Sequence, residues 1–413
     1  MAIQVTTMLR RKFEALTPGA RRSLVRVAAA LGEQLAYTGA FFIVQLVAAR
    51  WLSAHEFALF ASLYSVVILL SLVHGCAVFD TLLVFGKRGG RLLASSLLRA
   101  HTAVAVVLLV ATLYFIFLAG LSLPLALLFV LACASFALYW TARALAIVQG
   151  RTGLLIVPPL VQTLLVLLAQ ETSARGDIAT LFGCIVLGSG VPALFIYGYL
   201  NRGVDYRLAA GRVKAFVSVN LLAQLIFWGL THGLVIYFFL RGAPEQAGSL
   251  RISLTLLLPA QYLCIALSNQ VLPQLIGMLA KQQRQAFVSR SLQLLAACVA
   301  LSALYAGALS LGLGDALRAW FGKSFSGVDG GVLLALPVAF ALVQVGRTLL
   351  KASGEHRLML LCMLLGLAVV VISQGIAQPH ADQVLNYGVI SVAFALALAS
   401  GRLLLKINVK DGE

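Results

Sequence analysis

The chain is divided into long apolar runs, most of them about 20 residues long, and this feature limits the folds open to it. A run of that length is what an α-helix needs to cross the hydrocarbon core of a bilayer. The strands of a membrane barrel would instead alternate apolar and polar residues over about ten positions. Composition agrees, because 61% of the residues are hydrophobic and only 11% are charged, with a mean hydropathy of +0.98. A water-soluble globule would need more polar surface. We therefore predict an all-α integral membrane protein.

The breaks between apolar runs predict twelve transmembrane spans. They cover roughly residues 26–49, 57–84, 98–119, 122–147, 153–170, 179–200, 216–240, 249–279, 291–312, 330–350, 358–376 and 385–405. The longer spans can tilt or protrude from the bilayer. Residues 1–23 are basic and the first span lacks a small-residue cleavage site, so we interpret the start of the chain as a retained tail and not as a signal peptide.

Lysine and arginine are distributed unevenly between the two ends of these spans. With a cytoplasmic N-terminus, 25 of the 31 fall in cytoplasmic segments. The outer ends hold Arg50, Arg175, Arg241, Arg251, Arg318 and Lys323. The positive-inside rule then predicts that both termini are cytoplasmic. The net charge of +17 is accounted for by this topology and by attraction to anionic membrane lipids, so we expect no nucleic-acid partner.

The six cysteines all fall inside predicted spans and none is in a CxxC arrangement. We interpret them as small core residues, with no disulfide framework and no zinc site. No cofactor is expected.

A pattern repeats along the chain. "QLAYTG" at 34–39 returns as "QLIFWG" at 224–229, and the same offset of 190 aligns "AHEFA" at 54–58 with "PEQAG" at 244–248 and Asp80 with Gln270. "RALAIVQG" at 143–150 and "RTLLKASG" at 347–354 repeat at an offset of 204. An ordered series of this kind predicts two six-helix lobes, 1–206 and 207–413, related by a pseudo-two-fold axis along the membrane normal. Transporters built this way hold their substrate between the lobes and expose it to either side alternately.

Several stretches resemble a known family. The first hairpin, "LVAARWLSAHEFALFASLYSVVILLSLVHGCAVFDTLLVFGKR", and the later stretches "NQVLPQLIGMLAKQQR" and "LRAWFGKSFSGVDGGVLLALPVAFALVQVGRTLLKASGEHRLMLL" follow in order the signatures of the multidrug/oligosaccharidyl-lipid/polysaccharide (MOP) exporter superfamily. They are most similar to its Wzx-type polysaccharide flippases. Ala54 and Ala58 stand where that family usually has Pro and Gly, although Pro244 and Gly248 keep both in the second copy. The chain also lacks the fourteen spans expected of a lipid II flippase of the same superfamily.

The resemblance implies a flippase of the bacterial inner membrane, and not an enzyme. Its cargo would be an undecaprenyl-pyrophosphate-linked oligosaccharide for O-antigen, capsule or exopolysaccharide synthesis, and its partners would include the polysaccharide polymerase and export machinery. Three alternatives stay open: a cation-coupled multidrug antiporter of the same superfamily, a membrane enzyme of glycan assembly, and a non-transporting scaffold in a glycan-export complex.

Placing an ionisable or polar side chain inside a membrane span costs free energy. Such residues are therefore expected to have a function, and we take them as candidates for the substrate cleft. On the first span Arg26, Glu33 and Tyr37 share a helical face, and Gln34, Thr38 and Gln45 lie beside it. In the second copy Asn220, Gln224 and Thr231 align likewise, with His232 adjacent. The predicted substrate-binding residues are Arg26, Gln34, Gln224, His232, Arg251, Arg290 and Arg347, the arginines because a guanidinium fork fits phosphate oxygens bidentately.

Two carboxylates are candidates for binding a coupling proton or cation. Glu33 is the one carboxylate well inside a predicted span, and it either pairs with Arg26 or takes up a proton or cation during the cycle. Asp80 matches the family's Gly-x-Asp pattern, but a structural cap or an ion pair with Lys87 or Arg88 also explains it.

Structural roles are open for the other candidates. Gln34 and Gln224 could be hydrogen-bonded across a packed helix interface. Edge arginines could extend toward the membrane surface. His232 could change charge with pH or remain neutral and hydrogen-bonded.

Overall fold

The computed structural model describes residues 18–79, 94–149, 151–172, 176–200, 210–313, 316, 330–377 and 381–409, and the regular structure of this part is helical throughout. The first elements are α2 (Pro18–Trp51), α3 (Ala54–His74), η1 (Gly75–Phe79), α5 (Ala94–Ala119), α6 (Leu123–Val148), η3 (Thr152–Ile156), α7 (Val157–Thr172), α8 (Ile178–Ile185), η4 (Val186–Gly190) and α9 (Val191–Leu200). The remainder are α10 (Ala210–Trp228), η5 (Gly229–Gly233), α11 (Leu234–Leu240), α12 (Pro244–Ala280), α13 (Arg284–Ala308), η6 (Leu309–Leu313), α15 (Gly330–Ser353), α16 (His356–Ala377) and α17 (Ala381–Val409).

Every predicted span overlaps a helix. Within the described residues, ten helices are long and apolar enough to cross a membrane, and α5 has a shorter apolar part, Val104–Ala119. Helix α12 has 37 residues, about 55 Å at 1.5 Å per residue, which exceeds the thickness of the hydrocarbon core. Large apolar side chains are exposed on the surface, including Phe117 (79%) and Leu311 (89%). Lipid is the solvent that such a surface requires.

Two predicted spans are interrupted in mid-course by a π-helical turn. Four such turns lie in the described residues, η1, η4, η5 and η6, and η4 and η5 interrupt the sixth and seventh spans in mid-course. A π turn inserts an extra residue into the helical ladder and is frequent at functional sites. The turn η5 contains Thr231 and His232, and both line the cavity described below.

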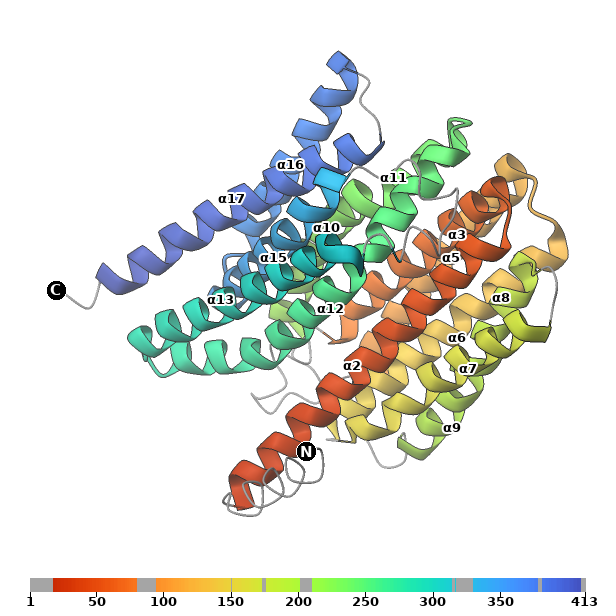
Figure 1. Cartoon of the computed structure of the whole chain (residues 1–413). Helices are drawn as coiled ribbons and strands as arrows, with labels where there is room; N and C mark the ends of the chain where they lie inside the picture. Colours follow the sequence, from red (N-terminus) through yellow and green to blue (C-terminus); the bar gives the residue numbers. More distant parts are fainter. Residues whose placement is uncertain are drawn as a thin grey trace.

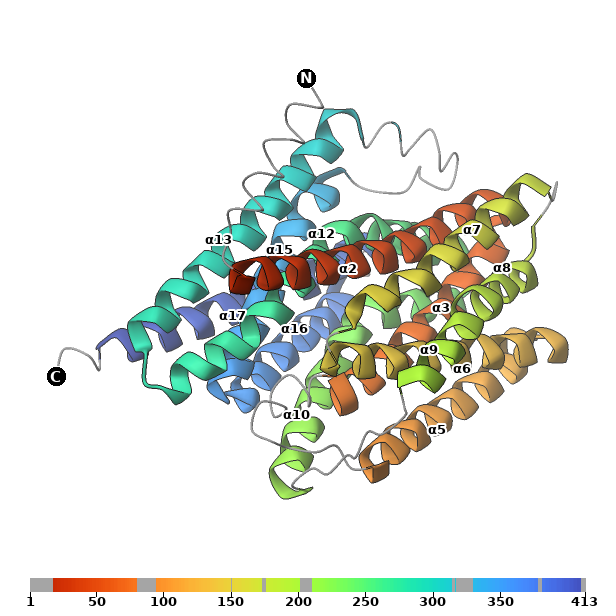
Figure 2. The ribbon, with the colours of Figure 1, turned by 90° about the horizontal axis from the view of Figure 1, so that it is seen from below.

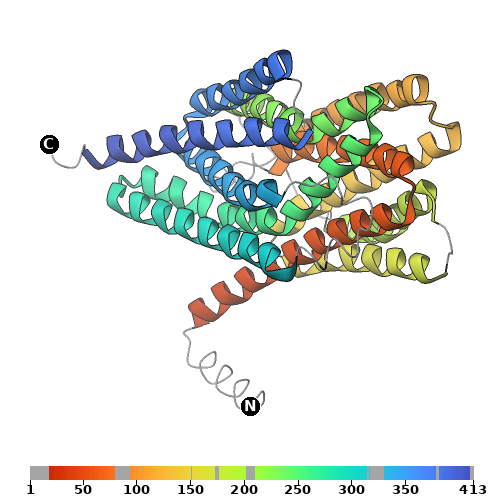
Figure 3. The ribbon, with the colours of Figure 1, turned by 45° about the horizontal axis from the view of Figure 1, so that its top comes forward.

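Helices α2–α9 gather on one side of the molecule and α10–α17 on the other, and the helix axes run roughly along one direction (Figure 1). Seen from below, α13 lies alongside α12 at the side opposite to α5 (Figure 2). The C-terminal helices α15, α16 and α17 pack against one another (Figure 3). Helix α12 contacts both α2 and α3 and so joins the two sides.

The start of α3 is set by a capping box. Ser53 Oγ accepts a hydrogen bond from the backbone N–H of Glu56, and the Glu56 carboxylate accepts one from the Ser53 N–H at 2.9 Å. Helix α3 begins at Ala54 and helix α12 at Pro244, so their first residues are separated by the predicted offset of 190. The repeat seen in the sequence therefore coincides with a repeat of helix starts.

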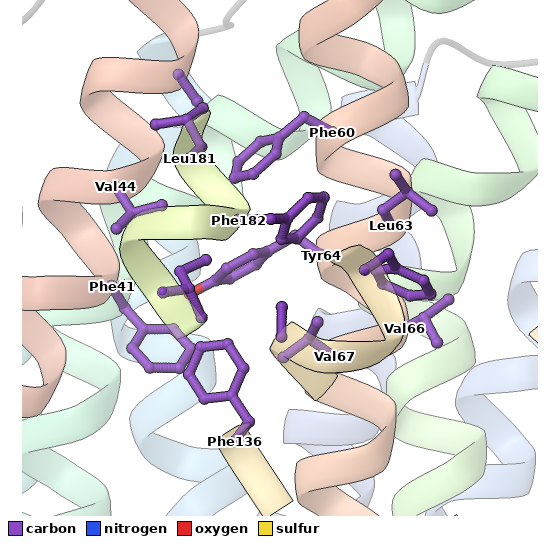
Figure 4. Packing of buried hydrophobic residues seen from close by; sticks show 14 of the residues in the cluster. Phe41, Val44, Phe60, Leu63, Tyr64, Val66, Val67, Phe136, Leu181 and Phe182 are labelled. Carbon is purple, nitrogen blue, oxygen red and sulfur yellow. The ribbon is translucent and has the colours of Figure 1, made fainter. Parts of the chain in front are cut away.

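An aromatic cluster packs the first side of the molecule (Figure 4). Phe60 lies 5.6 Å from Tyr64 and 5.5 Å from Phe182, measured between ring centroids, and Phe41 lies 5.4 Å from Tyr64 and 5.3 Å from Phe136. Tilted and edge-on pairs at these separations are favourable beyond simple burial. This packing fixes α2 and α3 beside the cavity described next.

Candidate functional site

A cavity of about 180 Å³ lies between helices from the two sides of the molecule. Helices α2, α3 and α6 line one side, and α10, η5, α12 and α15 line the other. Three basic residues line the cavity, Arg143, Arg347 and Lys351, together with His232. Five amide side chains also line it: Gln34, Gln224, Gln261, Asn269 and Gln344. None of the described residues that line it is a carboxylate.

Helical spacing explains how these side chains reach the cavity. On α15, Gln344, Arg347 and Lys351 are separated by steps of three and four, and so lie on one face. On α12, Gln261, Ile265 and Asn269 follow steps of four. Helix α15 thus presents a polar stripe to the cavity, and α12 presents two amides with Ile265 between them.

Arg143 of α6 forms a buried ion pair with Glu33 of α2. Its Nε donates to Glu33 Oε1 at 2.7 Å and its Nη2 donates to Glu33 Oε2 at 3.1 Å. The same Nη2 donates to Gln34 Oε1 at 2.8 Å, and the Tyr139 hydroxyl donates to Glu33 Oε1 at 3.3 Å. The fork geometry and the additional hydrogen bonds are what a buried ion pair needs to offset its desolvation.

Aromatic rings enclose the Arg143 guanidinium. Its Cζ lies 5.5 Å from the ring centroid of Tyr37 and 5.1 Å from that of Trp140, within the range of a cation–π contact. Tyr37 in turn meets Tyr262 of α12 edge-on, with centroids 5.8 Å apart. Tyr37 therefore connects the Glu33–Arg143 ion pair to α12, which belongs to the other side of the molecule.

A second buried arginine lies behind the cavity wall. Arg251 of α12 is 1% exposed, and its Nε donates to Gln45 Oε1 of α2 at 2.9 Å. Its Nη1 lies 3.2 Å from Nδ1 of His232, which lines the cavity. An arginine can only donate, so His232 Nδ1 accepts and the ring is neutral with its proton on Nε2. Of the two alternatives for His232, the geometry favours the neutral, hydrogen-bonded one.

The structure brings together four of the predicted substrate-binding residues, since Gln34, Gln224, His232 and Arg347 all line the cavity. Arg251 reaches it only through His232. Arg290 does not line it, and its Nη1 donates to Gln293 on its own helix α13 at 3.0 Å. The side chain of Arg26 and the whole of Asp80 lie outside the described residues.

Glu33 pairs with Arg143. The pair with Arg26, one of the two sequence interpretations of Glu33, lies outside the described residues, because the side chain of Arg26 is not among them. That interpretation compared residues on the same helix, whereas the partner is 110 positions away in the chain. Gln34 is also hydrogen-bonded to a neighbouring helix, as the structural alternative expected, while it faces the cavity.

Sequence reasoning missed Arg143 and Lys351 as site residues. A signal for Arg143 was available, because the repeat at an offset of 204 pairs it with Arg347, and both line the cavity. Lys351 follows Arg347 by one helical turn.

The six cysteines are buried, as the sequence predicted, and all six are free in the structure. Among the described residues, no group of three or more His, Cys, Asp or Glu side chains could hold a metal ion.

Comparison with known proteins shows a likeness of fold. No family model and no curated protein matches the chain. A mutant of the Vibrio cholerae MATE transporter VcmN superposes with a TM-score of 0.64 and 13% identity, covering 94% of this chain and 97% of that one. An inward-facing multidrug resistance MATE transporter of the MOP superfamily gives a TM-score of 0.62 and 11% identity, covering 92% and 99%.

The fold is MATE-like. A MOP superfamily transporter from Pyrococcus furiosus shares it, with a TM-score of 0.64 and 12% identity over 93% of this chain and 97% of that one. That transporter is described as having a binding pocket of reverse polarity, which suggests a different function for it. A MATE-like fold can therefore hold pockets of different polarity. The kind of cargo has to be inferred from the residues that line the cavity, and not from the fold.

Proposed function

We propose that this protein is a MOP-type transporter that moves an undecaprenyl-pyrophosphate-linked oligosaccharide from the cytoplasmic to the outer leaflet of the bacterial inner membrane. The observation that carries the proposal is the polarity of the cavity. Arg347 and Lys351 line it together with Arg143, whose charge is balanced by Glu33, and none of the described residues that line the cavity is a carboxylate. Such a lining suits an anionic head group. The MATE-like fold supports a transporter of this superfamily.

The chemistry of the cargo explains why such a cavity is required. A sugar diphosphate cannot enter hydrocarbon unaided, because an unpaired buried anion is very costly. Guanidinium and ammonium donors replace the lost hydration, and the amides of Gln224, Gln261 and Asn269 can bind sugar hydroxyls. The lipid tail stays in the bilayer. At 100 mV, inside negative, outward movement of two negative charges is favoured by roughly 4.6 kcal/mol.

In this proposal, residues 1–206 and 207–413 act as two lobes of six spans each, with cytoplasmic termini. The cavity between the helices of the two lobes opens to either side in turn as the lobes rock. The exposed turns on either side of the membrane provide a test of this orientation.

Two exposed glutamates offer a matched pair for that test. Glu245 lies at the start of α12 and Glu355 lies between α15 and α16. We expect a membrane-impermeant maleimide to label Glu245→Cys in intact spheroplasts and to label Glu355→Cys only after lysis. The native cysteines are buried and give a low background. Labelling of Glu355→Cys before lysis, with Glu245→Cys protected, would reverse the proposed topology.

The function itself is tested by reconstitution. Proteoliposomes containing a polyprenyl-diphosphate oligosaccharide in the inner leaflet are exposed to an impermeant glycosidase outside, and the released sugar is measured over time. We expect the wild-type protein to expose the inner pool and the Arg347→Gln variant to do so much more slowly. Sugar release at the rate of protein-free liposomes would count against the proposal.

A second candidate is a cation-coupled multidrug antiporter. Two observations favour it: the fold is shared with multidrug MATE transporters, and a carboxylate, Glu33, is buried beside the cavity. In that case Glu33 would exchange a cation for a drug. Expression of the wild type would then lower the accumulation of cationic drugs in cells, and Glu33→Gln would abolish that effect. If drug accumulation is the same with and without the protein, antiport is excluded for the drugs tested.

A further inference from the structure

A set of contacts joins the two sides of the molecule beyond one end of the cavity. The basic residues that line the cavity, Arg143, Arg347 and Lys351, lie in the last two turns of α6 and α15. Both helices end on the cytoplasmic side in the proposed topology. The contacts described next come instead from the first halves of α3 and α12 and from the second half of α2, which lie toward the outer side in that topology.

Arg251 of α12 bridges α2 and η5 at the wall of the cavity. Its Nε donates to Gln45 Oε1 of α2 at 2.9 Å, and its Nη1 lies 3.2 Å from Nδ1 of His232. His232 itself lines the cavity, whereas Arg251 and Gln45 are both 1% exposed. One guanidinium therefore connects the first side of the molecule to a residue of the cavity wall.

Packing continues this closure toward the starts of α3 and α12. A Cβ placed on Gly248 of α12 would lie 3.3 Å from Cδ1 of Phe57 of α3, so the absence of a side chain at Gly248 lets the two helices lie close together. Ala58 and Ala61 of α3 are completely buried in the hydrophobic cluster of the second side. The two sides are thus joined here by apolar packing as well as by hydrogen bonds.

The partners of Arg251 are neutral, although Arg251 is a cation. Among the described residues no carboxylate pairs with it, and its Cζ lies 5.0 Å from the ring centroid of Tyr64. Burying a cation among neutral groups costs free energy, and exposure to water returns its hydration. The closed arrangement is therefore opposed by the desolvation of Arg251 and favoured by its hydrogen bonds and the surrounding packing. A closure that has to open and reform needs such a balance.

We propose that Arg251, Gln45 and His232 form an outer latch, which seals the cavity from the outside of the membrane and separates when the cavity opens outward. The latch rests on the proposed function in one respect, the opening of the cavity to each side in turn. It adds the residues that hold one of the two states, and it assigns the structure to the state that is closed on the outside. Arg251 then controls access to the cavity and does not contact the diphosphate.

Access of an impermeant maleimide to the cavity from outside tests the latch. Asn269→Cys provides a thiol in the cavity, and Cys76, which also lines it, is replaced by alanine in every variant. The full-length protein is labelled in intact spheroplasts without added cargo. We expect slow labelling with the latch intact and a rate about 10-fold higher in Gln45→Ala, which removes one hydrogen bond to a charged group. Gln293→Ala removes an amide from α13, outside the latch, and should leave the rate unchanged.

A disulfide across the outer ends of α3 and α12 separates opening of the latch from loss of structure. Phe57→Cys and Gly248→Cys place two thiols where these helices approach closely. We expect the pair to form a disulfide under mild oxidation and to return Gln45→Ala to slow labelling, with reduction restoring the fast rate. A variant that had lost its fold would stay fast when cross-linked. If Gln45→Ala does not fold, Arg251→Lys replaces it, because an ammonium lacks the fork that spans Gln45 and His232.

Three results would overturn the latch. Equal outside labelling with and without Gln45→Ala would show that these hydrogen bonds do not control access. Failure of the cysteine pair at positions 57 and 248 to cross-link would show that the outer ends are apart. The same labelling pattern with the reagent on the cytoplasmic side alone would place the closure at the other end. Because no cargo is added, a failed sugar-release assay beside a working latch would refute the proposed cargo and leave the latch in place.

Discussion

Replacing Arg143 by glutamine is expected to destabilise the protein by about 3–5 kcal/mol. Glu33 would remain buried at 3% exposure without the fork of donors that now balances its charge. The loss is measured as a fall in the thermal unfolding midpoint in detergent and as a lower monodisperse yield. Leaving one charge of a buried pair unpaired is among the most costly single substitutions.

The double variant Glu33→Gln/Arg143→Gln provides the control for this prediction. With both charges removed, the two amides can still hydrogen-bond, so we expect most of the lost stability to return. If Arg143 only stabilises the fold, the double variant also transports at the wild-type rate. If it contacts cargo as well, the double variant folds but transports slowly. An Arg143→Gln variant as stable as the wild type would mean that the ion pair contributes little.

Replacing Arg347 or Lys351 by glutamine is expected to weaken binding of the anionic cargo by about 10-fold to 100-fold. That range corresponds to the loss of one hydrogen bond to a charged group, about 1.5–3 kcal/mol. Both residues lie on the same face of α15 and line the cavity, so the two effects should be similar in size. Affinity is measured with the purified variants and a soluble short-chain polyprenyl diphosphate.

Arg290→Gln is the matched control for these two substitutions. It removes the same charge from α13, which does not line the cavity. We expect its affinity to equal that of the wild type. Equal losses in Arg290→Gln and Arg347→Gln would indicate a general effect of net charge and would argue against a cargo contact at α15.

Much of the fold could be predicted from the sequence because the bilayer limits the choices. A run such as 122–147 has to be helical in lipid, and the structure has α6 at Leu123–Val148. The helices α3 and α12 start at Ala54 and Pro244, which are separated by the 190 residues of the sequence repeat. Hydrophobic length does not reveal a π turn, so η4 and η5 could not be predicted from it.

The site was predicted only in part, because its pairings are distant along the chain. Gln34 and Gln224 were found from their repeated motif. The partner of Glu33 could not be found by helical periodicity, since periodicity relates residues on one helix and Arg143 is on another. Gln45 and Arg251 meet across 206 positions for the same reason. Such contacts depend on how helices pack, which one sequence does not specify.

The central claim is that the cavity binds an anionic amphiphile, and intrinsic tryptophan fluorescence of the purified protein tests it most directly. Trp140 and Trp228 both line the cavity, so their emission should report its occupation. We expect a polyprenyl-diphosphate saccharide to change the emission saturably, and a cationic drug to leave it unchanged and not to compete. Saturable binding of the cationic drug, with no response to the diphosphate lipid, would contradict the account.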